Sequence, residues 1–289
     1  MTIFPKIIYG EKSEKFKKII KKSEGVEIQF FDENGITSEF NFWDPIIEIK
    51  KEYPNLQEIT VHPPLYNYNF EMLVLKDKNI IKKQLSKMVE LSNQLNMKLN
   101  FLFHVYMTKE QYISTHLMDV LNELMKIIEN TNVTLLLENL YMMLDERYEC
   151  TVVEICKYIN HPNLRACIDT THEHCKANIY RFDFNELIEK DFNKEDCEEY
   201  VKQVHFAATL NNDGYRYKST HGRMHESIDT LREELKWLEK FGMLDKNYVT
   251  EVSEEDYSTR EDQIEEIRML NEVFDEIKNK VMYFEEDNR

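Results

Sequence analysis

Residues 133–138 read VTLLLE, a continuous apolar run that ends on the carboxylate of Glu138. Residues 164–169, LRACID, form a second strand candidate that ends on Asp169, and the charged, helix-like stretch Glu149–Ile159 separates the two. Continuous apolar runs are typical of parallel strands that are covered on both faces. A helix between two such strands predicts that both belong to one parallel sheet. The two carboxylates are therefore expected at the same edge of that sheet.

The same alternation of strand and helix runs along the chain in both directions. Eight strands are expected, at Lys6–Tyr9, Val26–Phe31, Glu58–His62, Lys98–His104, Val133–Glu138, Leu164–Asp169, Val201–Phe206 and Tyr248–Val252. Helical spacing is clearest at Glu11–Lys22, Asn79–Leu95, Lys109–Glu129, Glu149–Ile159, Ile228–Phe241 and Arg260–Val281. Eight strand–helix repeats predict an α/β fold that closes into a (β/α)8 TIM barrel. No linker rich in Gly, Ser or Pro interrupts the pattern, so residues 1–289 are expected to form one domain.

Composition narrows the class of protein. Of the 289 residues, 42% are hydrophobic, which favours a globular chain over a disordered one. The net charge of −17 makes a nucleic-acid partner less expected, because duplex DNA is bound mainly through Lys and Arg. The 5 cysteines include no CxxC pair, which is typical of a reduced, cytoplasmic protein.

Targeting and cofactor motifs are not evident in the sequence. The N-terminal residues lack the apolar core of a signal peptide, and no apolar stretch is long enough to span a bilayer, so no membrane contact is expected. No GxGxxG or P-loop pattern occurs, so no nucleotide cofactor is expected. We expect a monomer or a homodimer.

Six of the strand candidates bring a metal-binding type of side chain to their ends. These side chains are His62, His104, Glu138, Asp169, His205 and Glu251. Because the C-terminal ends of barrel strands converge on one face, where active sites lie, the pattern predicts a divalent metal site and so an enzyme. The three carboxylates together with His205 suit Mn²⁺, Mg²⁺ or Co²⁺ and are acceptable to Zn²⁺.

Each of these residues also has a purely structural interpretation. Glu138 or Glu251 alone could be a buried ion-pair partner, but with Asp169 a shared cation explains them better, since converging carboxylates repel. His62 and His104 could hold a second ion and raise the affinity for Zn²⁺, or each could be a core His bonded to a backbone carbonyl. Asp169 could cap the following helix beside an incidental His172.

The loop after the seventh strand is basic in an otherwise acidic protein. Arg216, Lys218 and His221 lie within it, next to several hydroxyl groups. Such a loop suits the binding of a phosphate, a carboxylate or sugar hydroxyls. The alternative is a solvated basic loop without a ligand.

Together these motifs resemble the xylose isomerase-like TIM-barrel superfamily, which contains sugar isomerases and epimerases and the endonuclease IV type of apurinic endonuclease (AP endonuclease family 2). The resemblance runs from Val26 to about Val252. Its motifs are Val61-His62-Pro63-Pro64, Phe103-His104, Leu137-Glu138-Asn139, Ile168-Asp169-Thr170-Thr171-His172, Val204-His205 and Thr250-Glu251. The resemblance implies one metal site shared by both branches, formed by Glu138, Asp169, His205 and Glu251. It also implies that His172 contacts the substrate, or a further metal ion in the endonuclease case.

The endonuclease branch implies a larger set of zinc ligands. His62, His104, Glu138 and Glu251 match the first ion, and Asp169 and His205 complete the second. The third ion needs His172 with an Asp-x-His pair, but this chain has Ser219-Thr220-His221, which lacks the Asp. The residues after His104 are Val105-Tyr106, where the endonucleases usually carry Pro-Gly. Asn212-Asp213-Gly214 followed by His221 looks like the loop of isomerase and epimerase members.

The first functional expectation is a divalent-metal-dependent sugar or sugar-phosphate isomerase or epimerase. Glu138 and Glu251 would exchange the proton through a metal-stabilised enediolate, while His172, Arg216, Lys218 and His221 orient the substrate. The alternative is a zinc-dependent phosphodiesterase of the apurinic endonuclease type. A third hypothesis is a barrel that binds a small ligand without turning it over.

Overall fold

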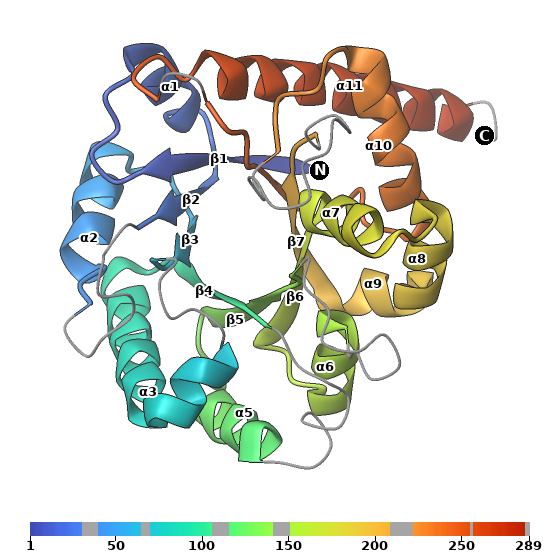
Figure 1. Ribbon diagram of the computed structural model, residues 1–289. Coiled ribbons are helices and arrows are strands. Elements are labelled where there is room, and N and C mark those ends of the chain that lie inside the picture. The colour runs from blue at the N-terminus through green and yellow to red at the C-terminus, as the bar shows by residue number, and fades with distance from the viewer. Residues whose placement is uncertain are drawn as a thin grey trace.

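Eight parallel strands form a closed barrel in the computed structural model, which describes residues 1–30, 40–64, 70–105, 116–140, 151–208, 222–254 and 257–286. The strands follow one another around the barrel in sequence order, and the helices surround them (Figure 1). They are β1 (Thr2–Ile8), β2 (Gly25–Gln29), β3 (Glu58–His62), β4 (Lys98–His104), β5 (Val133–Glu138), β6 (Leu164–Asp169), β7 (Val201–Phe206) and β8 (Asn247–Thr250). The predicted (β/α)8 TIM barrel is confirmed.

The outer layer contains both expected and unexpected helices. It comprises α1 (Glu14–Ile20), α2 (Trp43–Glu52), α3 (Phe70–Leu95), α5 (His116–Ile128), α6 (Val152–Ile159), α7 (Thr170–Tyr180), α8 (Phe184–Asp191), α9 (Lys194–Tyr200), α10 (Ile228–Lys240) and α11 (Glu261–Glu286). The sequence patterns did not predict α2, α7, α8 or α9. Helix α7 is hard to recognise because it buries polar residues, including Glu173 and Lys176, and so has no apolar stripe.

The strand boundaries agree with the sequence patterns except in β1, β2 and β8; β2 runs from Gly25 to Gln29, whereas Val26–Phe31 was expected. Strands β3 to β7 have the predicted bounds, whereas β1 begins at Thr2 and β8 ends at Thr250. Residues 2–5 belong to β1 because they pair with residues 247–250 of β8. This pairing joins the two ends of the sheet, so no local pattern reports it. Glu251 consequently lies just beyond β8 rather than within it.

The two faces of the sheet differ in chemistry. Outward-facing residues such as Ile28, Val61 and Val204 belong to a large apolar cluster that packs beneath the helices. Side chains in the interior hydrogen-bond across the barrel, as Thr60 Oγ1 does to Gln203 Oε1 at 3.0 Å. Strands β2, β3 and β7 therefore alternate apolar and polar residues, although continuous apolar runs were the expectation for most strands. This polar interior leads up to the C-terminal ends of the strands.

None of the described helices combines the length and apolar character that a bilayer span requires.

Candidate metal centre

The six strand-end residues singled out by the sequence lie together at the C-terminal mouth of the barrel. His62, His104, Glu138 and Asp169 are the last residues of β3 to β6, His205 is the penultimate residue of β7, and Glu251 follows β8. The strand register sets His104 beside Glu138 and Asp169 beside His205. All six side chains are buried or nearly so. The barrel thus concentrates side chains that are far apart in the sequence.

Four of these residues form one compact group. Glu138, Asp169, His205 and Glu251 each offer a ligand atom, and these atoms all lie within 4.8 Å of one another. His205 Nδ1 lies 2.6 Å from Glu251 Oε2 and 3.3 Å from Glu138 Oε1. His205 Nδ1 and Glu138 Oε2 are buried, and their described neighbours are ion-pair contacts within the centre rather than well-aligned hydrogen bonds. Buried polar atoms of this kind need a partner, and a cation would provide one.

The charge balance also fits a cation. Burial, together with the neighbouring Glu251 and Glu138, raises the pKa of Asp169 to about 8. Burial alone would lower the pKa of His205, but the surrounding carboxylates outweigh it and hold that pKa well above its usual value. The cluster therefore retains protons to offset its negative charge. A divalent ion would replace those protons, and the three carboxylates and one imidazole are donors that such ions accept.

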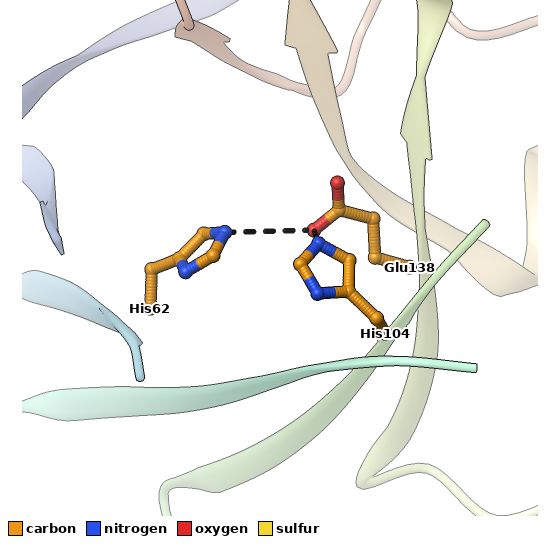
Figure 2. A group of neighbouring side chains, drawn as sticks. All are labelled: His62, His104 and Glu138. Atoms are coloured by element: carbon orange, nitrogen blue, oxygen red, sulfur yellow. Dashed lines mark ion pairs between the residues drawn. The ribbon is translucent and has the colours of Figure 1, made fainter. Parts of the chain in front are cut away.

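A second group lies against the other oxygen of Glu138. His104 Nε2 is 3.3 Å and His62 Nε2 is 3.9 Å from Glu138 Oε2, and Figure 2 shows both rings turned toward this carboxylate. His62 Nδ1 donates to the carbonyl of Pro63 at 3.2 Å, which leaves Nε2 as the ring atom that faces Glu138. Burial, followed by the charge of Lys6, lowers the pKa of His62 to about 3, so its ring is neutral. His62 therefore fits both interpretations: Nδ1 bonds a backbone carbonyl, and Nε2 lies near Glu138, where an ion could bind.

Asp169 and His172 are held together by the start of α7. Asp169 Oδ1 accepts a hydrogen bond from the His172 backbone N–H at 2.9 Å, so Asp169 does cap the helix. Its other oxygen, Oδ2, lies 3.6 Å from His172 Nδ1. His172 Nδ1 donates to the carbonyl of Asn139 at 2.8 Å, and burial lowers the pKa of this ring to about 4. His172 is consequently a neutral imidazole beside the group of four, not an incidental surface residue.

Three neighbouring residues were missed by the sequence patterns. Lys6 donates to Glu251 Oε1 and lies 3.1 Å from Glu27 Oε1, and Glu27 Oε2 accepts from His205 Nε2 at 2.8 Å. Asn139 Oδ1 accepts the Asp169 backbone N–H at 2.7 Å. The signal for Lys6 and Glu27 was their charge inside apolar strand runs, at positions that alternate with Ile7 and Ile28.

The basic loop after β7 is not among the described residues. Arg216, Lys218 and His221, like Ser219 and Thr220, lie outside the described residues. The described part of the segment resumes at Gly222, and Arg223 pairs with Ala208 beyond the end of β7. His225 is directed to a structural contact, because its Nδ1 bonds Glu266 on α11 at 2.5 Å.

Comparison with known proteins identifies relatives of this barrel. The family model described as a xylose isomerase-like TIM barrel matches residues 13–273. A search for similar sequences among curated proteins found no match.

Several solved structures are similar to the chain over nearly its whole length. A D-tagatose 3-epimerase-like protein has a TM-score of 0.58 and 19% identity, with 97% of this chain and 100% of that chain covered. An IolI protein with a bound zinc atom has a TM-score of 0.58 and 18% identity, covering 97% and 99%. The 3-keto-D-glucoside 4-epimerase from E. coli has a TM-score of 0.51 and 14% identity, covering 93% and 99%. At these identities the likeness demonstrates a shared fold.

Proposed function

Because the chain belongs to the xylose isomerase-like TIM-barrel family, we propose that it is a divalent-metal-dependent sugar or sugar-phosphate isomerase or epimerase. The observation that carries the proposal is the buried group of Glu138, Asp169, His205 and Glu251, whose ligand atoms lie within 4.8 Å of one another. Similar folds that are described as epimerases of sugars, among them the E. coli enzyme, support sugar chemistry. The IolI structure with zinc supports a metal in this family.

The four residues would hold the ion through one imidazole nitrogen and three carboxylates. When bound, a divalent ion supplies Lewis-acid stabilisation of the negative charge that develops on substrate oxygens as a carbon-bound proton leaves. Side chains of the protein would carry out the proton transfer and orient the substrate.

Glu138 and Glu251 are the proposed proton carriers. Burial would raise the pKa of Glu138, but His104 and His205 outweigh it and hold that pKa well below its usual value. Glu138 is therefore ionised and able to accept a proton from carbon. Lys6 donates to Glu251 Oε1, and the other oxygen of Glu251 lies toward His205. When it carries a proton, Glu251 would donate it to carbon on the other side of the substrate while Glu138 holds the abstracted proton, so that one proton leaves carbon and one returns. In the reverse direction the two would exchange roles.

Substrate orientation is assigned to residues around these carboxylates. His172 is neutral, so its ring can accept a hydrogen bond from a substrate hydroxyl without adding charge. Arg216, Lys218 and His221 remain proposed contacts for a phosphate or for sugar hydroxyls. The small-molecule substrate and the absence of a nucleotide cofactor are part of the same proposal.

The proton-transfer role is tested by exchange with solvent. Wild-type protein loaded with Mn²⁺, Co²⁺, Mg²⁺ or Zn²⁺ is incubated in D2O with ketoses and their phosphates, and deuterium at carbon is followed by NMR. Glu138→Gln should reduce exchange by about 10³-fold or more, because removal of a positioned base typically costs 10²–10⁴-fold. Glu58→Gln is the matched control, since Glu58 is a buried carboxylate at the start of β3, at the end of the barrel away from Glu138. Exchange by Glu138→Gln at the wild-type rate would exclude this role.

One observation favours a second candidate, a zinc-dependent phosphodiesterase of the apurinic endonuclease type. His62, His104 and Glu138 form a separate donor group with ligand atoms within 4.8 Å of one another, so Glu138 could bridge two ions. In such a site, adjacent zinc ions activate water and neutralise charge at phosphorus.

Metal stoichiometry distinguishes the two candidates. The isomerase predicts one tightly bound ion per chain and no nicking of abasic DNA. Two or three zinc ions per chain in elemental analysis, together with nicking of an abasic duplex, would favour the phosphodiesterase. His62→Ala should leave a single-ion enzyme fully loaded, whereas a multi-zinc protein should lose one ion.

A further inference from the structure

A buried ion pair lies directly behind two members of the metal centre. Lys6 of β1 and Glu27 of β2 are partners in the strand register, and both are buried. Their Nζ and Oε1 atoms are 3.1 Å apart. Burying two charges has a large desolvation cost, and apolar residues of similar size are often as good or better for stability. The fold alone therefore gives little reason for a lysine and a glutamate at these positions.

Glu27 contacts the imidazole of His205. Glu27 Oε2 accepts from His205 Nε2 at 2.8 Å and from Gln203 Nε2 at 2.8 Å, and Gln203 is itself fixed by Thr60 at 3.0 Å. Because a carboxylate can only accept here, Glu27 keeps a proton on His205 Nε2. Nδ1, the ring atom that faces Glu138 and Glu251, is then the nitrogen that would exchange its proton for an ion. A carboxylate behind a ligating His fixes its tautomer and ring orientation in many metal sites.

Lys6 contacts Glu251 from behind, as Glu27 contacts His205. Its ammonium group donates to Glu251 Oε1, and the other oxygen of Glu251, Oε2, lies 2.6 Å from His205 Nδ1. Lys6 is a single point charge shared by Glu27 and Glu251, so it links the two halves of the arrangement. The chain of contacts runs from His205 through Glu27 and Lys6 to Glu251 and closes on itself.

We propose that Lys6 and Glu27 are positioning residues that hold His205 and Glu251 in their metal-binding geometry. Lys6 fixes which oxygen of Glu251 faces the ion, and Glu27 fixes which nitrogen of His205 does so. This role rests on the proposed function, because it presupposes the metal centre. It concerns side chains that do not themselves reach the ion.

The test measures metal affinity, independently of any substrate. Co²⁺, Mn²⁺ and Zn²⁺ are titrated by calorimetry into the metal-free wild type, Lys6→Met and Glu27→Gln, and the visible spectrum of the Co²⁺ forms is recorded. Loss of the partner behind a ligand typically weakens metal binding by about 10- to 100-fold, which is the expected effect of either variant. The Co²⁺ spectrum should change in both, since the ligands would no longer be held in place.

A second Lys–Glu pair in the same barrel, which is only partly buried, provides the control. Lys202 Nζ lies 3.0 Å from Glu58 Oε1 at the N-terminal ends of β7 and β3, away from the metal centre. Lys202→Met and Glu58→Gln remove the same kinds of charge, and both should bind the three ions with wild-type affinity. Equal losses in the two pairs would mean that any buried charge affects the site through stability, and the positioning role would be wrong.

Other outcomes are equally decisive. Wild-type affinity in Lys6→Met and Glu27→Gln would overturn the positioning role while leaving the proposed function intact. A wild-type protein that binds none of the ions would refute both. If a single variant does not fold, the double variant Lys6→Met/Glu27→Gln removes the unpaired charge and should fold with the same loss of affinity. A double variant that is also unfolded would make the pair structural and contradict the proposal.

Discussion

Asp169 makes a different contact with each of its two carboxylate oxygens. Oδ1 caps helix α7 through the His172 backbone N–H, while Oδ2 lies near the His172 ring. Capping interactions contribute on the order of 1 kcal/mol to helix stability. The same contact fixes the side chain within the group of four, so a structural role and a proposed ligand role reinforce each other.

Metal affinity should depend on pH because Asp169 must lose a proton to bind an ion. Its pKa of about 8 lies above its usual value, so the metal-free protein holds this proton at neutral pH. We expect affinity to fall by about tenfold or more per pH unit below pH 8, because Asp169 and the Nδ1 nitrogen of His205 must both be free of protons when an ion binds. Calorimetry at pH 6, 7, 8 and 9, in two buffers of different ionisation enthalpy, measures both affinity and proton release. Constant affinity between pH 6 and 8 would contradict the prediction.

The raised pKa of Asp169 also affects the stability of the metal-free protein. A carboxyl group whose pKa is raised on folding stabilises the folded state most at low pH and loses that contribution as pH rises through the raised pKa. Asp169 therefore destabilises the metal-free protein progressively between about pH 4 and pH 8. A bound ion would reverse this effect, so the increase in melting temperature on adding metal should itself grow over that range.

Among the elements, α11 stabilises the seam where β1 meets β8. Arg260, directly before α11, is buried and donates to the carbonyl of Lys6 and to Gln263, and Gln263 donates to the carbonyl of Thr250. The guanidinium group also lies 4.7 Å from the centre of the Phe16 ring. In Figure 1, α11 lies beside α1 across the outside of this seam. Arg260 thus joins α1, α11 and β1 directly, and it reaches β8 through Gln263.

Replacing Arg260 should destabilise the whole barrel. Arg260→Ala removes the positive charge opposite Glu11 and a donor to the Lys6 carbonyl, and loss of one partner from a buried pair costs about 3–5 kcal/mol. Urea denaturation followed by circular dichroism measures this free energy of unfolding. Arg232→Ala is the control, because Arg232 pairs with Glu276 at the surface and should contribute at most about 1 kcal/mol. Equal effects of the two substitutions would show that the seam does not depend on Arg260.

At the scale of the whole molecule, the barrel separates apolar packing from polar chemistry. The apolar cluster lies between strands and helices, while charged and polar side chains fill much of the interior. Lys202, Asn100 and Glu58 form a hydrogen-bonded group at the N-terminal end, whereas the proposed metal centre lies at the C-terminal end. This division is typical of the fold, in which one end supports stability and the other carries activity.

Strand–helix alternation was sufficient to predict the barrel, because the strands and most of the helices that cover them leave a local pattern. The positions of His62, His104, Glu138, Asp169, His205 and Glu251 were predictable too, since parallel strands bring their C-terminal ends to one face. Helix α7 escaped because it buries polar residues that support the site, which removes the periodic signal.

The closure of β1 on β8, the contacts of Lys6 and Glu27, and the ring nitrogen that His205 presents were decided only by the tertiary structure. Glu27 meets His205 and Lys6 meets Glu251 across separations of 178 and 245 residues, respectively. A charged residue inside an apolar strand run indicates that a partner of opposite charge must lie near it in the fold. Its partner is set by the curvature and register of the closed sheet, which no short stretch of sequence contains.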